Sequence, residues 1–234
     1  MGTATIAPMP TAYFIAGTDT GVGKTTIACA LLQALALSGR SVVGMKPVAA
    51  GCVATPLGLQ NEDVKLLCAA STLDAPPEWV NPYALRAAVA PHLAAEQDGV
   101  QLELSTMVHA FQHLQRLADV VIVEGVGGWM VPFNAAETSA DLAQALNLPI
   151  ILVVGMRLGC LSHALLTAQA LQAQGLQLYG WVANHIDPDM ALFDENVQTL
   201  SARLGAPLLG IVPHCTTASQ TQTLVPFLNI SLLG

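Results

Sequence analysis

The sequence predicts an α/β fold, a doubly wound and mostly parallel sheet with helices on both faces. Two observations lead to this prediction. Short apolar runs typical of buried strands alternate along the chain with stretches of helical periodicity. The first apolar run also leads directly into a glycine-rich loop and a helix, and this order of elements is typical of a phosphate-binding loop. A length of 234 residues fits a single domain spanning 1–234.

The glycine-rich loop occupies residues 17–25, with the sequence GTDTGVGKT, after an apolar run at 13–16. Glycines let the backbone fold tightly against phosphate oxygens, while the N-terminus of the following helix and Lys24 supply positive charge. The hydroxyl of Thr25 is then placed to bind a magnesium ion that accompanies a nucleotide. The alternative is a strand-to-helix turn that holds a lysine without binding a ligand.

The other elements follow in order. Helices are expected, from apolar periodicity and end signals, at 26–38, 62–68, 105–117, 139–146, 162–174 and 192–204. Strands are expected at the apolar runs 41–45, 118–124, 149–155, 179–184 and 208–213. Residues 216–223 are expected to form a surface loop before a short C-terminal element.

Residues 48–101 are dotted with proline and glycine, so we expect a long loop region that holds the helix at 62–68. Extended loops in α/β domains usually build the functional site. The strand–helix–strand unit before this region has a right-handed crossover, which places Lys46 on the same sheet edge as the glycine-rich loop.

Three charged side chains are candidates for chemistry at that edge. Lys46 suits an anionic substrate or a developing phosphoryl charge, or else it is a solvated residue at a strand end. Glu124 ends an apolar strand, where an acid is often directed at a metal, although it could instead cap the glycine turn that follows. Asp63 begins a helix, and with Thr25 and Glu124 it makes the oxygen-rich set that Mg²⁺ needs beside phosphates.

Composition limits the possible partners. A net charge of −8 argues against a general affinity for nucleic acid or an anionic membrane. Charged residues are 10% of the chain and hydrophobic residues 53%, so we expect another subunit to cover part of the surface. Residues 1–8 do not resemble a signal peptide, and the apolar stretch 148–155 is too short to span a bilayer. With five cysteines and no CxxC pair, we expect reduced thiols and a cytoplasmic location.

The histidines and Cys160 are weaker candidates. His109 and His113 stand one helical turn apart without an obvious third metal ligand, so a solvated helix face is the expected role. Cys160 lies near a helix start, where a thiol can become reactive, but a buried and inert thiol is the favoured interpretation.

Five segments stand out together, namely 17–25 (GTDTGVGKT), 46–48 (KPV), 124–129 (EGVGGW), 159–164 (GCLSHA) and 180–184 (GWVAN). Their combination is similar to the dethiobiotin synthetase family, over about residues 13–214. The resemblance implies a P-loop NTPase-like fold and a ring closure that depends on ATP and Mg²⁺. One amine of 7,8-diaminononanoate takes up CO2 as a carbamate, ATP phosphorylates the carbamate, and the second amine displaces phosphate to form the cyclic urea of dethiobiotin.

The resemblance also assigns roles to individual positions. It implies that Lys46 is the catalytic lysine and that Thr25, Asp63 and Glu124 hold Mg²⁺. It implies contacts to the diamine substrate from Thr20, Ala50 and Ser162, with the region around Ser162 acting across the interface of a homodimer. The residues expected to bind ATP are Gly21, Val22, Gly23, Lys24, Thr25, Thr26, Asp63, Glu124, Gly125, Val126, Gly127, Asn184, Pro213, His214 and Cys215.

Two positions depart from the family pattern, and another family shares the loop. Ala50 stands where relatives commonly carry Ser or Thr, and Ser162 stands where Asn is familiar. The rival family is that of partition and septum-site ATPases, which move cargo. Those proteins have a signature lysine at the position of Asp19 and tend to end in a membrane-binding helix, whereas residues 225–228 carry no basic face. A non-catalytic nucleotide-binding scaffold is a third interpretation, which the two lysines of the site disfavour.

Overall fold

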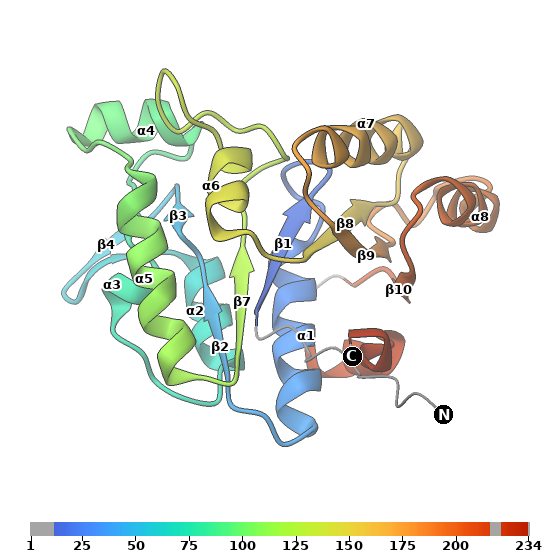
Figure 1. Cartoon of the computed structure of the whole chain (residues 1–234), viewed down its shortest axis with the longest axis horizontal. Helices are drawn as coiled ribbons and strands as arrows, with labels where there is room; N and C mark the ends of the chain where they lie inside the picture. The colour runs from blue at the N-terminus through green and yellow to red at the C-terminus, as the bar shows by residue number, and fades with distance from the viewer. Residues whose placement is uncertain (1–11, 216–220, 234) are drawn as a thin grey trace, which may run out of the picture.

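The computed structural model describes residues 12–215 and 221–233, so the expectation about residues 1–8 lies outside the described residues. Six parallel strands form the central sheet in the order β10-β9-β8-β1-β7-β2 (Figure 1). The strands are β1 (Ala12–Gly17), β2 (Val42–Met45), β7 (Val120–Glu124), β8 (Ile150–Gly155), β9 (Leu178–Asn184) and β10 (Leu208–Val212). The predicted parallel α/β sheet is confirmed.

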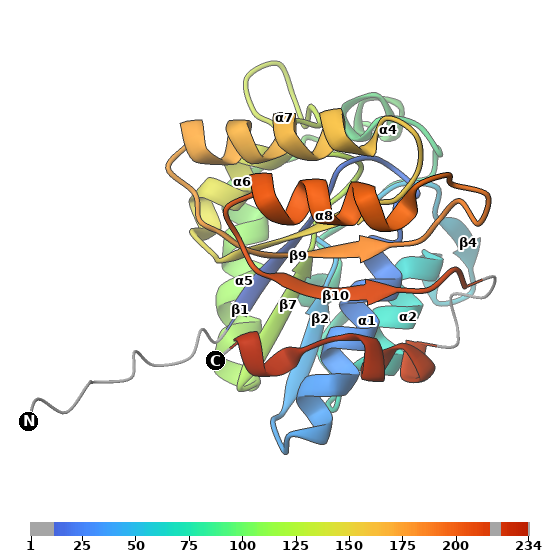
Figure 2. The same cartoon turned by 90° about the vertical axis from the view of Figure 1, so that its right-hand side faces the viewer.

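Helices cover both faces of this sheet because successive side chains of each strand enter two different cores. Tyr13 and Ile15 of β1 belong to one core, and Phe14 between them belongs to the other. The first core lies under α1 (Lys24–Leu37), α2 (Glu62–Ala70), η1 (Thr221–Phe227) and η2 (Ile230–Leu233). The second lies under α5 (Leu104–Leu117), α6 (Ser139–Leu146), α7 (Cys160–Ala173) and α8 (Phe193–Arg203). Figure 2 shows α7 and α8 on one side of the sheet and α1 on the other.

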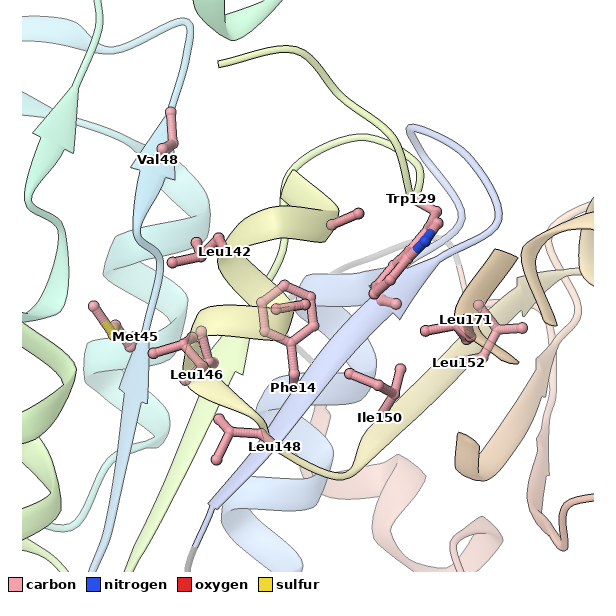
Figure 3. Close-up of a cluster of buried hydrophobic side chains, with 14 of the residues drawn as sticks. Phe14, Met45, Val48, Trp129, Leu142, Leu146, Leu148, Ile150, Leu152 and Leu171 are labelled. Carbon is pink, nitrogen blue, oxygen red and sulfur yellow. The ribbon is translucent and has the colours of Figure 1, made fainter. Parts of the chain in front are cut away.

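The second core is the larger of the two and contains an edge-to-face contact between two aromatic rings. Its central side chains, drawn in Figure 3, include Phe14, Leu142, Leu146, Leu148, Ile150, Leu152 and Leu171. The ring of Trp129 lies over the end of β1 and meets Phe14 edge to face, with ring centroids 6.4 Å apart. Strands that are buried on both faces have continuous apolar sequences, so their positions could be predicted from the sequence.

The region 48–101 contains more regular structure than predicted. It holds two small sheets, β3 (Val48–Ala49) with β6 (Tyr83–Ala84) and β4 (Val53–Thr55) with β5 (Gly58–Gln60). It also holds α2 and the helices α3 (Pro77–Val80) and α4 (Pro91–Asp98). Strands of two or three residues are too short to show a period of two. The helices α3 and α4 each begin with a proline, and the prolines of this region had indicated a loop.

The C-terminal prediction was partly wrong. Residues 221–223 begin the 3₁₀ helix η1, and residues 216–220 lie outside the described part of the chain. Leu224 and Leu233 are buried against the α1 face of the sheet, and the Tyr13 hydroxyl donates to the Leu233 carbonyl at 2.7 Å. The Asn229 amide donates to the Leu209 carbonyl at 2.7 Å, so this segment also covers the outer edge of β10.

Most other boundaries agree with the prediction within two residues. Strand β7 starts at Val120 rather than at 118 because the Ala118 amide still donates to the Leu114 carbonyl and ends α5. The carboxylate of Asp119 then accepts hydrogen bonds from the amide and hydroxyl of Ser41. None of the described helices is both long enough and apolar enough to cross a bilayer.

Candidate active site

A cleft of about 900 Å³ lies at the sheet edge where β1, β2 and β7 end. The structure gathers many of the sequence-predicted site residues in its wall, namely Thr20, Gly21, Gly23, Lys24, Thr25, Thr26, Lys46, Ala50, Asp63, Glu124, Val126 and Gly127. The long region 48–101 contributes residues 61–63 and 88–91 to the same wall. The region expected to form a long loop therefore lines part of the same cleft as the glycine-rich loop.

The glycine-rich loop folds back on Lys24. Gly21 and Gly23 have φ angles of 73° and 89°, in the left-handed region that favours glycine. Lys24 begins α1 and is 7% exposed, and its Nζ donates to the carbonyls of Asp19 (2.9 Å) and Gly127 (2.6 Å). Burial is the main reason that the pKa of Lys24 is lowered to about 8. Because an ammonium has three N–H donors, Lys24 can keep both carbonyl bonds and donate once more to a phosphate oxygen.

A second lysine forms a buried charge cluster deeper in the cleft. Lys46 Nζ donates to Glu124 Oε1 at 2.5 Å and to Asp63 Oδ2 at 3.0 Å, and Thr25 Oγ1 donates to Glu124 Oε1 at 2.8 Å. Lys46 is 4% exposed and Glu124 is 1% exposed. Burial opposes the charged form of Lys46, but the carboxylates of Glu124 and Asp63 outweigh burial and raise its pKa. Burial likewise opposes the charged form of Asp63, and the charge of Lys46 outweighs it and lowers the pKa of that carboxyl.

Glu124 has one oxygen to spare. Its Oε1 accepts from Lys46 and Thr25, whereas its buried Oε2 has no hydrogen-bond partner among the described residues. Within the described ranges, three or more His, Cys, Asp or Glu side chains nowhere come together as a metal site. Two carboxylates and a hydroxyl fit a Mg²⁺ ion only if phosphate oxygens or waters complete its octahedral shell.

Asn184 lies on the other flank of the glycine-rich loop, at the end of β9. Its side chain donates to the Val22 carbonyl at 2.8 Å, and a Cβ on Gly23 would lie 2.2 Å from its Nδ2. Asn184 therefore supports the glycine-rich loop by a hydrogen bond. Its side chain also leaves no room for a Cβ at position 23, so this position requires glycine. Residues 213–215 follow β10, and His214 Nδ1 lies 3.1 Å from the His185 carbonyl. Neither Asn184 nor residues 213–215 line the cleft.

Sequence reasoning missed two polar side chains that shape the site. Arg157 pairs with Asp19 of the glycine-rich loop at 2.5 Å, from the segment that follows β8. Asn61 lines the cleft and donates to the Ala50 carbonyl at 3.1 Å. Asn61 caps α2, so its position before an acidic helix start was a usable signal, whereas Arg157 has no local signal.

Other candidates lie away from the cleft. Ser162 is on α7 and lines a separate surface hollow of about 740 Å³. Within one chain it therefore does not share a cleft with Thr20 and Ala50, the other residues expected to contact the substrate. The His113 ring stacks on Trp79 with centroids 4.5 Å apart, which gives it a packing role. Cys160 is 2% exposed, as expected for an inert thiol.

Comparisons with known proteins agree with this geometry. A family model described as an AAA domain matches residues 11–222. The ATP-dependent dethiobiotin synthetase BioD of Aromatoleum aromaticum is 54% identical over 91% of this chain and 95% of its own length. The protein of the same name from Nitrosospira multiformis is 55% identical over 95% of this chain and 96% of its own length.

Solved structures extend the comparison to the fold alone. The MinD cell division protein of Aquifex aeolicus has a TM-score of 0.56 and 17% identity, covering 94% of this chain and 89% of that one. The signal recognition particle receptor FtsY of Elizabethkingia anophelis has a TM-score of 0.54 and 17% identity, covering 99% of this chain and 65% of that one.

The charge cluster makes Lys46 important for stability. Lys46→Met should lower the free energy of unfolding by about 3–5 kcal/mol, because it leaves the carboxylate of Glu124 buried without its partner. The double variant Lys46→Met with Glu124→Gln should recover most of that loss, since no buried charge remains at that position. Denaturant unfolding without nucleotide or metal measures both effects. Arg157→Met is the control, because it breaks an ion pair whose side chains are 43% and 44% exposed and should change stability little. A double variant as unstable as Lys46→Met would contradict the argument.

Proposed function

We propose that this chain, which belongs to the ATP-dependent dethiobiotin synthetase family, closes the ring of 7,8-diaminononanoate with CO2 in this cleft. The reaction cleaves ATP to ADP and phosphate. The observation that carries the assignment to this cleft is the pair of buried lysines in its wall. Lys24 and Lys46 offer two positive charges to a reaction in which negative charge moves from ATP to a carbamate.

The nucleotide would bind at the glycine-rich loop. Lys24 would keep its bonds to the carbonyls of Asp19 and Gly127 and donate its third N–H to a phosphate oxygen, and the loop amides and the start of α1 would add further donors. The adenine would lie beyond the other flank of the loop, toward Asn184 and residues 213–215. Support for that location comes from the direct contact between Asn184 and the loop.

The family also implies Mg²⁺, which we propose is held by Thr25, Asp63 and Glu124. The spare Oε2 of Glu124 and the oxygen-only donor set fit such an ion. When bound, it would neutralise charge on the phosphate oxygens.

Lys46 is the proposed catalytic residue. Two carboxylates hold its ammonium in one position, and their charges favour its charged form and raise its pKa. A charge fixed in advance stabilises the carbamate and the transferring phosphoryl group without reorganising during the step. Thr20 and the methyl group of Ala50 line the same cleft and would contact the diamine. The second amine would then attack the phosphorylated carbamate carbon, and phosphate would leave as the urea ring closes.

We further propose that the chain acts as a homodimer in the cytoplasm, with Ser162 reaching the substrate of the partner subunit. Support comes from the exposed leucines around Ser162, since Leu158 is 96% exposed and Leu166 is 61% exposed. The cytoplasm supplies ATP and keeps thiols reduced.

The septum-site ATPase interpretation is weaker. The likeness to MinD is at 17% identity and concerns the fold, whereas the synthetases are 54% and 55% identical. The position of the signature lysine in that family is here Asp19, which is paired with Arg157.

The function is tested by measuring ADP release with diaminononanoate and bicarbonate each present or omitted. We expect ADP and dethiobiotin to form in equal amounts when both are present, and little ADP when either is missing. ADP release that is independent of the diamine would instead favour an ATPase without synthetic activity.

The two lysines should separate kinetically. Lys24→Ala should weaken ATP binding roughly tenfold to a hundredfold in calorimetry, since it removes a charge-assisted phosphate contact.

Lys46→Gln should lower kcat by roughly a hundredfold with a smaller effect on ATP affinity, because its charge matters most as phosphoryl charge develops. Normal kcat in Lys46→Gln would remove Lys46 from the chemical step.

The dimer is tested by light scattering at micromolar concentration. Wild type should have twice the 24.3 kDa mass of one chain, and Leu166→Glu should dissociate it and lower activity by placing a charge in the interface. Leu57→Glu is the matched control, because Leu57 is 88% exposed on the β4–β5 turn, far from α7 in the sequence. An active wild-type monomer would exclude the proposal.

A further inference from the structure

The segment after β7 carries one of the two carbonyls that hold Lys24. Gly127, with a φ angle of 62°, presents its carbonyl to Lys24 Nζ at 2.6 Å. The same turn is tight, because a Cβ on Gly127 would lie 2.8 Å from the Val131 side chain. The position of the Gly127 carbonyl therefore depends on how residues 129–131 are held.

Ser139, the first residue of α6, holds those residues through three hydrogen bonds. Its hydroxyl donates to the Trp129 carbonyl at 2.5 Å and accepts from the Val131 amide at 3.0 Å. Its own amide donates to the Val131 carbonyl at 2.8 Å. The side chain is buried, since Ser139 is 3% exposed, so water cannot easily replace these bonds.

Trp129 is fixed a second time from the opposite side. Its Nε1 donates to Gln174 Oε1 at 3.1 Å, at the end of α7. Its ring meets Phe14 of β1 edge to face, above the sheet edge (Figure 3). In the described part of the chain, Lys24, Ser139 and Gln174 all make side-chain hydrogen bonds with residues 125–131.

We propose that Ser139 is a positioning residue for nucleotide binding, which acts through residues 129–131 to place the Gly127 carbonyl and the Lys24 ammonium. The proposal rests on the proposed ATP-binding function. Ser139 lines no part of the cleft, so it touches neither nucleotide nor substrate. Its effect should appear in ATP affinity, and Lys46 should still perform the chemical step because it is held by Glu124 and Asp63.

The test is calorimetric titration of the full chain with Mg·ATP, together with steady-state kinetics. Ser139→Ala leaves the Val131 amide and the Trp129 carbonyl without their partner, and we expect Kd and KM for ATP to rise about tenfold while kcat stays within about twofold. Hydrogen exchange at the amides of Gly127 and Gly128 should accelerate. Ser139→Thr keeps the hydroxyl and should bind ATP nearly as tightly as wild type.

Leu200→Ala separates positioning from a general loss of stability. Leu200 of α8 is fully buried in the second core and does not line the cleft, so the variant creates a cavity away from the site. We expect its Tm to fall while its ATP affinity stays unchanged. If Ser139→Ala fails to fold, Gln174→Leu removes the other support of Trp129 and should raise Kd for ATP severalfold.

The outcomes distinguish the two proposals. Wild type that binds no ATP would overturn the proposed function and this inference together. Wild type that binds ATP while Ser139→Ala, or Gln174→Leu in its place, binds it equally well would overturn the inference alone. Tenfold weaker ATP binding by Leu200→Ala would also overturn it, because any loss of stability would then have the same effect.

Discussion

The buried charge of Glu124 is the constraint on which the rest of the site depends. A carboxylate that is 1% exposed is strongly unfavourable unless cations and donors surround it. Lys46 supplies the cation from the end of β2, and Thr25 supplies a donor from α1. Lys46 in turn requires a second acceptor, which Asp63 of α2 provides. One buried charge thus draws together residues from β7, β2, α1 and α2 before any ligand arrives.

The sequence predicted the central sheet well because its strands are buried on both faces. Such strands are uniform apolar runs, and their assignment needs no knowledge of the tertiary partners. The small strands between residues 48 and 84 were missed because two or three side chains cannot establish a period. The 3₁₀ helix η1 was missed for another reason. It is buried by packing against α1, which no local pattern encodes.

Site prediction divides along the same line. Lys46 and Glu124 could be recognised because a charge that ends or directly follows an apolar strand lies at the sheet edge. Arg157 could not, because its partner Asp19 is 138 residues away in the chain. Ser139 was assigned only as a helix start, and its three bonds to residues 129–131 arise from the return of the chain after a loop. Asn184 was assigned by resemblance as a ligand contact, and the structure adds that its amide supports the loop.

The strand order has a consequence for how the protein acquires its site during synthesis. Strand β1 lies in the middle of the sheet, and its neighbours are β7 and β8, which end at Glu124 and Gly155. More than half of the chain must therefore leave the ribosome before β1 gains either neighbour. The glycine-rich loop that follows β1 cannot take its final position before then. Contacts between residues so far apart in sequence form slowly. The chain loses the conformational entropy of a long loop before strand pairing supplies any stabilising energy. Until then the apolar side chains of β1 lack the neighbouring strands that bury them, so the N-terminal part of the nascent chain is the segment that most needs protection from aggregation.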